Sequence, residues 1–345
     1  MSIPIVKLVF LLSAYPIEGE NIGVGWLLEN SKPLEGFSVT HEPDEADIIL
    51  FVEGHPGLDP YFFRVINHTL FKKYPQKCIL FHDADRSVTL ARTITPCIHK
   101  NRADPATKAG FHYIARPMEN HFINTAKDFD CPRDYLFSFD GASKRNPTRQ
   151  AIMQLEHPQG LLIDRGGQRI WTFTDKELKE MQRHFAESML RSHFVLCPAG
   201  IGPSSYRLFE TMQLARVPVI LSDQLVLPEG PDWNEFSITI PERMAHCIPE
   251  ILEERKSEAR EMGITAREVW EDYFSPEVSL QRLCEAADRR VVHPYKSFQK
   301  LHDCANFLHK EHSRGLFRYI FRQRKQLKQQ LANLTMDAYH PQSTD

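Results

Sequence analysis

Short apolar runs alternate with amphipathic stretches through the first third of the chain. Four of the runs predict buried β-strands: Val6–Ser13, Ala46–Glu53, Cys78–Ala84 and Phe111–Ala115. Between two of them, Leu58–Lys73 places apolar residues at helical spacing. Strands that alternate with helices in this way are typical of a parallel sheet covered by helices.

The alternation stops over Arg116–Arg133, a segment with two prolines and few aliphatic residues that we interpret as a linker. The strands expected beyond it are Tyr135–Phe139, Gly160–Asp164, His193–Cys197 and Val217–Ser222. The helices expected there are Arg149–His157, Asp175–Leu190 behind the capping box Thr174–Glu177, Ser205–Ala215 and two segments within Ile248–Arg289. We therefore predict two α/β domains, residues 1–125 and 126–295, and a helical basic tail, residues 296–345.

Length and composition agree with a globular protein of two domains. The chain has 345 residues, of which 42% are hydrophobic and 25% charged, and its net charge of −3 does not support a dedicated nucleic-acid binder. The seven cysteines include no C-x-x-C pair, which argues against a disulfide framework or a zinc site and favours reduced thiols in the cytoplasm. The apolar run Val6–Leu12 is far shorter than the roughly 20 residues of a spanning helix, so we expect a first strand and no signal sequence.

The segment Leu196–Glu210 carries the most specific chemistry, because it runs from a strand through a glycine loop into a helix. Gly200 and Gly202 allow backbone N–H groups to approach an anion. Ser204 and Ser205 are placed either to cap the helix or to donate hydroxyl hydrogen bonds to the anion. The free N–H groups and the positive end of the helix dipole then face phosphates. The alternative interpretation is an ordinary turn followed by an ordinary helix cap.

Two charged residues in the helix after this loop extend the prediction. Glu210 lies one to two turns into the helix, where its carboxylate reaches back to ribose hydroxyls. Arg207 adds positive charge for a diphosphate.

The wider context of the loop resembles the exostosin family of glycosyltransferases. The matching residues form a series of short motifs: Leu196-Cys197-Pro198, Gly202-Pro203-Ser204-Ser205, Arg207-Leu208-Phe209-Glu210, Val217-Pro218-Val219-Ile220, Ser222-Asp223, Leu227-Pro228, and Trp233 with Phe236. Upstream, Phe137–Ala142 and Arg149 are similar to the family's Ser-Phe-x-Gly-Ala segment and its following arginine. The resemblance covers about Tyr135–Glu242. One departure is Ala215, where the family usually has a glycine that suits a left-handed helix cap.

The resemblance implies a GT-B-like fold, with two Rossmann-like α/β domains whose parallel sheets face a cleft. The first domain is then the acceptor side and the second binds the nucleotide sugar. The family moves a sugar from a nucleotide diphosphosugar, with UDP-sugars as the first expectation, to a glycan or another hydroxyl acceptor. The resemblance also implies that the anomeric carbon is inverted, as in the family. Such folds generally need no bound metal, so no cofactor is expected.

Charged residues after strands supply the remaining candidates. Lys144, Arg145 and Arg149 follow the strand that ends at Phe139 and are candidates to offset the charge of the departing diphosphate; the alternative is a solvated basic turn. The base that takes the acceptor proton is expected from the first domain. Asp85 is the first choice, and the others are Asp83, Glu53 and His55, each of which also suits a turn or a helix cap.

Other functions stay open at this point. Asp83-Ala84-Asp85 has the Asp-x-Asp form of a metal site, but the nucleotide signature lies in the other domain, which argues against that interpretation. An inactive sugar-nucleotide- or glycan-binding protein and a sugar-nucleotide epimerase are the alternatives to a transferase. The basic tail Lys296–Lys328 is either a solvated helix or a peripheral contact with anionic lipid.

Overall fold

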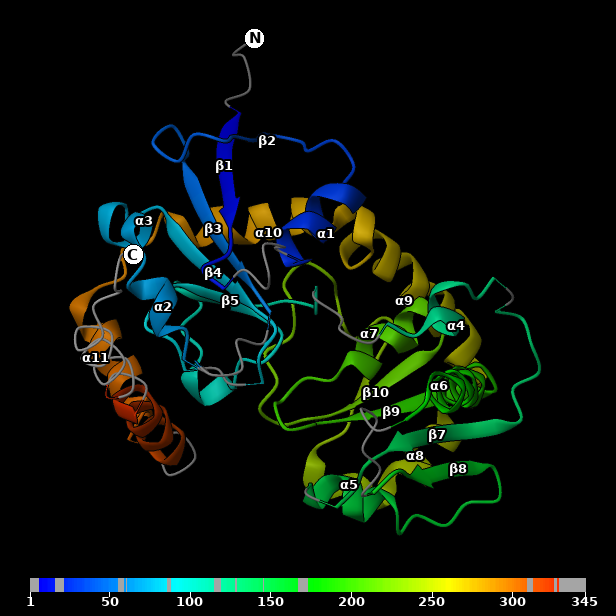
Figure 1. Cartoon of the computed structure of the whole chain (residues 1–345). Coiled ribbons are helices and arrows are strands. Elements are labelled where there is room, and N and C mark those ends of the chain that lie inside the picture. The colour runs from blue at the N-terminus through cyan, green and yellow to red at the C-terminus, as the bar shows by residue number, and fades with distance from the viewer. Residues whose placement is uncertain are drawn as a thin grey trace, which may run out of the picture.

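The computed structural model describes residues 6–15, 22–54, 59, 61–85, 88–114, 119–127, 129–144, 146–166, 173–308, 313–325 and 328. These residues form two parallel β-sheets, each between layers of helices (Figure 1). The predicted GT-B-like arrangement of two Rossmann-like α/β halves is confirmed. The domain boundaries stay a prediction.

The first sheet holds six strands in the order β2-β1-β3-β4-β5-β6, and the registers of its strand pairs are all parallel. Its strands are β1 (Lys7–Leu12), β2 (Phe37–Val39), β3 (Ile48–Glu53), β4 (Cys78–His82), β5 (Thr93–Thr95) and β6 (Lys108–Gly110). Because β3 and β4 are buried along their whole length, they read as continuous apolar runs. The helices α1 (Ile22–Asn30) and α10 (Pro276–Val291) pack on one face, and α2 (Phe63–Ile66) and α3 (Thr69–Lys73) on the other.

The second sheet holds five strands in the order β11-β10-β9-β7-β8. Its strands are β7 (Tyr135–Gly141), β8 (Gly160–Asp164), β9 (Ser192–Pro198), β10 (Val217–Leu221) and β11 (Ile238–Thr239). One face packs against α4 (His121–Asn124), α6 (Asp175–Leu190), α7 (Tyr206–Gln213) and α9 (Ala259–Tyr273). The other face packs against α5 (Pro147–Ile152) and α8 (Ile248–Glu254). Short 3₁₀ turns cover Lys100–Arg102, Glu242–Cys247 and Lys256–Glu258.

The chain returns to the first half after it completes the second. Helix α10 contributes Leu280, Leu283 and Cys284 to the core of the first sheet, so the two halves are connected twice, before α4 and between α9 and α10 (Figure 1). Helix α11 (Ser297–Asn306) then lies beside the first half. No helix among the described residues is long and apolar enough to cross a membrane.

Three local predictions have clear outcomes. The capping box at Thr174 and Glu177 is confirmed at the start of α6. The helix expected over Leu58–Lys73 is divided into α2 and α3, since the His68 side chain accepts from the N–H of Leu70 and begins a new helix. The strand expected at Phe111–Ala115 is wrong over its described part: β6 ends at Gly110, and residues 111–114 form no strand. Phe111 and Tyr113 are aromatic because Phe111 belongs to the first core and Tyr113 to the second. Ala115 lies outside the described residues.

Candidate functional site

A cavity of about 320 Å³ lies at the carboxyl end of β7 in the second half, and we call it the strand-end cavity. Ligands of parallel α/β sheets bind at this edge, and the volume lies in the range of small-molecule sites. The residues that line it come from the N-cap of α4, from β7 and the residue after it, from α5, α6 and α7, and from the segment after β8: Asn120, Asp140, Gly141, Ala142, Arg149, Arg165, Leu178, Met181, Gln182, Phe185, Arg207 and Glu210. Three residues predicted from the sequence, Arg149, Arg207 and Glu210, therefore share one cavity.

Arg207 is the most constrained charge in the cavity, since only 7% of its surface is exposed. Its guanidinium lies 4.5 Å from the ring centre of Phe139 and 5.5 Å from that of Phe185. One nitrogen, Nη2, donates to the backbone oxygen of Asp140, whereas Nε and Nη1 have no hydrogen-bond partner among the described residues. Burial lowers the pKa of Arg207. A buried cation with two unused donors is a strong site for an anion, because an acceptor there satisfies both donors.

Gly141 provides the space for this guanidinium. A Cβ at position 141 would lie 2.7 Å from Nη2 of Arg207, which is too close for any other residue without a shift of the arginine. The glycine of the Phe137–Ala142 motif is thus explained by close approach of a side chain.

Arg149 holds the glycine loop in place. Its Nε donates to the oxygen of Ala199 at 2.8 Å, and its Nη1 to the oxygen of Ala142 at 3.1 Å. Asn146 adds a further bond to the oxygen of Ala199. Burial, and then the neighbouring charge of Arg207, lower the pKa of Arg149 to about 10. Two arginines that repel one another at a buried site favour the arrival of an anion.

Asp140 and Arg165 form an ion pair that sequence reasoning missed. Arg165 donates to both carboxylate oxygens of Asp140 at 2.7 Å, and this pairing raises the pKa of Arg165. Asp140 is in the Phe137–Ala142 motif, and Arg165 follows the end of β8, which is the signal that would have found it. With Glu210, the cavity holds three cations and two carboxylates, an excess of one positive charge.

The glycine loop lies between this cavity and the first half. A Cβ at Gly202 would lie 2.7 Å from Sγ of Cys97 and 3.1 Å from the backbone oxygen of Asp85, so the loop packs directly on the segments after β4 and β5. A Cβ at Gly200 would lie 3.4 Å from Nη2 of Arg149. Ser205 is the N-cap residue of α7, but its side chain makes no capping hydrogen bond, and Ser204 is buried.

The basic turn after β7 has one cation whose place is described. Lys144 is exposed in this turn and is absent from the residues that line the strand-end cavity. Arg145 lies outside the described residues. The described cations of the cavity are Arg149, Arg165 and Arg207, and the roles of all these residues stay predictions.

The carboxyl edge of the first sheet presents the candidate bases. Asp85 is half-buried beside the glycine loop, and Cys97 Sγ lies 3.9 Å from its Oδ1. Asp83 is buried, and its two oxygens accept from the N–H of Ile114 at 3.2 and 3.1 Å, which gives it a structural role. His55 lies outside the described residues.

Glu53 ends β3 and is 2% exposed. It accepts from the hydroxyl of Ser13 at 2.6 Å and from the N–H of Ala14 at 2.7 Å. Burial nevertheless raises the pKa of Glu53 to about 7, in the range where a carboxylate exchanges protons near neutral pH.

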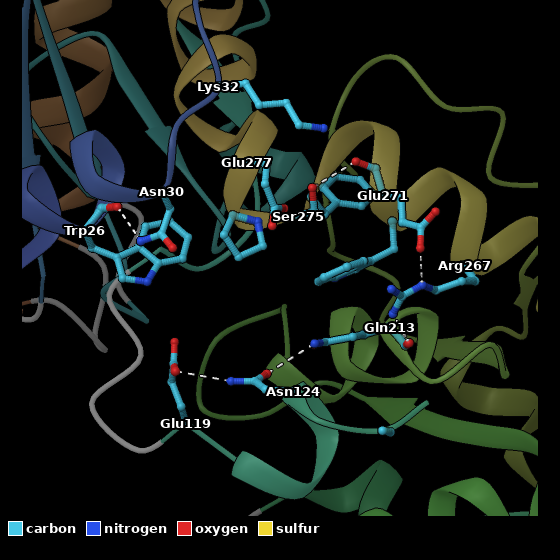
Figure 2. Close-up of a pocket in the computed structure, with 14 residues that line it drawn as sticks. Trp26, Asn30, Lys32, Glu119, Asn124, Gln213, Arg267, Glu271, Ser275 and Glu277 are labelled. Atoms are coloured by element: carbon cyan, nitrogen blue, oxygen red, sulfur yellow. Dashed lines mark hydrogen bonds and ion pairs between the residues drawn. The ribbon is translucent and has the colours of Figure 1, made fainter. Parts of the chain in front are cut away.

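A second and larger cavity, of about 550 Å³, lies where the chain passes between the halves, and we call it the hinge cavity (Figure 2). Trp26, Asn30 and Lys32 come from the first half, and Gln213, at the end of α7, comes from the second. The remaining lining comes from the two connections and from the helices beside them, α4, α9 and α10: Glu119, Asn124, Ala126, Arg267, Trp270, Glu271, Phe274, Ser275, Pro276 and Glu277.

The polar groups of the hinge cavity bond to one another. Figure 2 shows Gln213 directed at Asn124, whose Oδ1 accepts at 3.2 Å, and Asn124 in turn donates to Glu119 at 3.2 Å. Arg267 donates to Glu271 at 2.7 Å and to the backbone oxygen of Gln213 at 2.6 Å. Its guanidinium also lies 4.6 Å from the ring centre of Trp270. These bonds lie within the second half and the connection that leads into it, and Arg267 joins α9 to the end of α7. Oε1 of Gln213 and Nε1 of Trp270 have no hydrogen-bond partner among the described residues.

No group of three or more His, Cys, Asp or Glu side chains is placed to hold a metal ion within the described ranges. The cysteines among those residues are all free thiols, four of them buried.

Comparison with known proteins places the strand-end cavity in a known domain. Residues 101–254 match the model of the Exostosin GT47 domain. The chain is 37% identical over 93 residues to an exostosin-1 homolog of Caenorhabditis elegans, a match that covers 26% of this chain and 24% of that protein. It is 38% identical over 71 residues to a probable glucuronoxylan glucuronosyltransferase of Arabidopsis thaliana, with 20% and 15% covered. The chain thus spans about a quarter of the length of these relatives or less.

Among solved structures, a putative UDP-N-acetylglucosamine 2-epimerase from Listeria monocytogenes is similar, with a TM-score of 0.31 and 14% identity. The match covers 75% of this chain and 90% of that one. At this TM-score the likeness carries no argument about function.

Proposed function

We propose that this protein transfers a sugar from a nucleotide diphosphosugar to a hydroxyl of a glycan or another acceptor, because residues 101–254 match the model of the Exostosin GT47 domain, the domain of a glycosyltransferase family. The observation that carries the proposal is the strand-end cavity. It combines the buried, incompletely bonded guanidinium of Arg207 with Glu210 and two further arginines.

The donor is held by Arg207 and Glu210, which lie about one turn apart on α7. Nε and Nη1 of Arg207 donate to the diphosphate, whose oxygens accept from a guanidinium with favourable geometry. Glu210 accepts from the ribose hydroxyls. Backbone N–H groups between Gly200 and Ser205, at the start of α7, contribute a further partial positive charge.

Transfer proceeds by direct displacement. Asp85 takes the proton of the acceptor hydroxyl as its oxygen bonds to the anomeric carbon, while the bond from that carbon to the diphosphate oxygen breaks and its electron pair leaves with the diphosphate. Attack opposite the leaving group inverts the anomeric carbon. The arginines offset the charge that develops on the diphosphate, so the step is proposed to proceed without a metal.

The names of relatives suggest where to begin with the donor. The similar protein of Arabidopsis thaliana is named a probable glucuronosyltransferase, and UDP-glucuronic acid is therefore the first donor to test. The excess positive charge of the cavity suits a donor with an additional carboxylate. That the acceptor is a glycan or another hydroxyl compound, and that the protein acts in the cytoplasm, stay predictions from the sequence.

The test is incubation of the purified full chain with UDP-, GDP-, CDP- and TDP-sugars, with and without EDTA, followed by chromatography of nucleotides and sugars. Slow release of free sugar and nucleoside diphosphate, unchanged by EDTA, supports the proposal. Binding with no release supports an inactive sugar-nucleotide-binding protein. An isomerised donor supports an epimerase, and loss of release in EDTA contradicts metal independence.

A further inference from the structure

The chain after α11 forms a helix over residues 313–325 that is attached to the first half by one side only. Leu316 packs with the cluster of Tyr61, Val88 and Phe307. The Tyr319 ring lies 5.3 Å from that of Phe63. In Figure 1 this orange-to-red helix extends from the first half on the side away from α6 and β8.

The opposite side of the helix combines exposed aromatic rings with positive charge. Phe317 and Phe321 are 74% and 72% exposed, and their spacing of four residues places them on one face. Five exposed cations lie on the same helix: Arg314, Arg318, Arg322, Arg324 and Lys325. The sequence of residues 313–325 contains no Asp or Glu, so no acidic residue of this helix neutralises them.

Residues 297–308 expose further large apolar side chains. Phe298 and Leu301 of α11, and Leu308 just after it, are 65%, 72% and 81% exposed. Side chains of this size are ordinarily scattered singly on a protein surface, and a group of them rimmed by charge marks a contact surface.

The two features together select the partner. An acidic polysaccharide or a nucleic acid satisfies the cations but leaves Phe317 and Phe321 in water. An apolar protein groove covers the rings but gives no partner to five cations. A bilayer with anionic headgroups satisfies both, since aromatic side chains enter the acyl boundary while arginine and lysine remain at the phosphates.

We propose that the surface formed by residues 313–325 binds an anionic lipid bilayer and holds the protein at the membrane surface without crossing it. This surface lies on the first half, so the strand-end cavity of the second half stays accessible while the helix is bound. The inference does not depend on the sugar-transfer proposal.

The experiment is flotation of the full chain with vesicles of phosphatidylcholine alone or of phosphatidylcholine with 30% phosphatidylserine. We expect binding to the second type only, weakened by 0.5 M NaCl because salt screens the cations. The double variant Phe317→Ser/Phe321→Ser and the double variant Arg318→Gln/Arg322→Gln should each lower the bound-to-free ratio about tenfold. Ile264→Ser, which changes a side chain that is 50% exposed on α9 of the second half, is the matched control and should leave binding unchanged.

Several results would overturn the proposal. They are equal binding to both vesicle types, no binding to either, and retention of full binding by the phenylalanine variant. A partner of polyanion type is recognised with dextran sulfate: if that probe binds and the vesicles do not, the surface serves a soluble polyanion. Thermal unfolding of each variant, which should match the unaltered chain, shows that the effects arise at the surface.

Discussion

The strand-end cavity and the hinge cavity differ in how their charges are satisfied. The hinge cavity is the larger, at about 550 Å³ against 320 Å³, yet its half-buried cation Arg267 is bonded to Glu271 and to a backbone oxygen. In the smaller cavity, Arg207 is more deeply buried and keeps two nitrogens without a partner among the described residues. The size of a cavity therefore says less about function here than the bonds its charged groups have left to make.

This difference has a thermodynamic meaning. A buried charge with incomplete hydrogen bonding destabilises the fold, and it persists where a ligand supplies the missing partners. The bonds of Arg267 stabilise the packing of α9 on the end of α7, and they leave this cation little to gain from a ligand. We therefore expect that the charged groups of the strand-end cavity lower the stability of the fold and favour ligand binding. We expect that Arg267 in the hinge cavity raises stability and contributes little to ligand binding.

The strongest test of this contrast replaces one arginine in each cavity with methionine. Arg207→Met should lower sugar release from the donor by about a hundredfold or more, since a charge that stabilises the leaving diphosphate is lost. Its thermal stability should stay equal or rise, because a buried cation is replaced by an apolar chain of similar length. Arg267→Met should keep activity within about threefold and lose about 1 to 2 kcal/mol of stability with its hydrogen bonds.

Donor kinetics and thermal unfolding of both variants decide the matter. If Arg267→Met were the variant that lost activity while Arg207→Met stayed active, the hinge cavity would be the active site.

Replacing one carboxylate in each cavity also compares the two cavities, with a smaller expected effect on activity. Glu210→Gln should raise the KM of the donor about tenfold with a smaller change in kcat, since a charged acceptor for the ribose becomes a neutral one. Glu271→Gln, in the hinge cavity, should leave both constants unchanged. Initial rates over a range of donor concentrations separate the two constants, and an effect on kcat alone would argue that Glu210 acts on the reacting centre instead of the ribose.

Glu53, a buried carboxylate of the first half, is a further charged group whose burial has a cost. Burial raises its pKa to about 7 from an ordinary value near 4.5. The folded protein then binds more protons than the unfolded chain between these two values, so the contribution of Glu53 to stability is full below about pH 4.5 and is lost as the pH rises through 7. Over that interval the free energy of unfolding should fall by up to roughly 3 kcal/mol relative to Glu53→Gln, which does not titrate. Urea unfolding of both proteins at several pH values from 5 to 8 measures this difference, and a difference that stays constant with pH would contradict it.

The two cavities also show how far sequence reasoning reaches. Arg149, Arg207 and Glu210 were predicted because they stand in a local motif that a strand, a loop and a helix position together. Arg165 was missed because it follows a different strand and becomes part of the cavity only through its bonds with Asp140. The contact of Gly202 with Asp85 joins the two halves, and no spacing along the chain encodes how closely they pack. Phe111 and Tyr113 alternate with other residues as in a strand, which led to the wrong prediction. The alternation arises because Phe111 packs in the core of the first half and Tyr113 in that of the second.

The smallest expected effect concerns Ala215, which follows the helix that joins the two cavities. Ala215 has a φ of 53°, a left-handed conformation in which its Cβ is strained, at the position where the sequence analysis expects glycine. Ala215→Gly relieves roughly 1 to 2 kcal/mol of strain but removes a buried methyl group worth about 0.8 kcal/mol. The net gain should be about 0.5 kcal/mol, a rise of roughly 1 to 2 °C in Tm.

Activity should not change with this substitution, because Arg207 and Glu210 lie at the other end of α7. Gly263→Ala is the informative counterpart: a Cβ there would lie 2.5 Å from the backbone oxygen of Ala215, so this variant should lower Tm even though alanine favours a helix. Thermal unfolding of both variants tests the pair. A lower Tm for Ala215→Gly would mean that the packing of the methyl group outweighs the strain of the backbone, and that the end of α7 near the hinge cavity, like the rest of that cavity, is already arranged for stability.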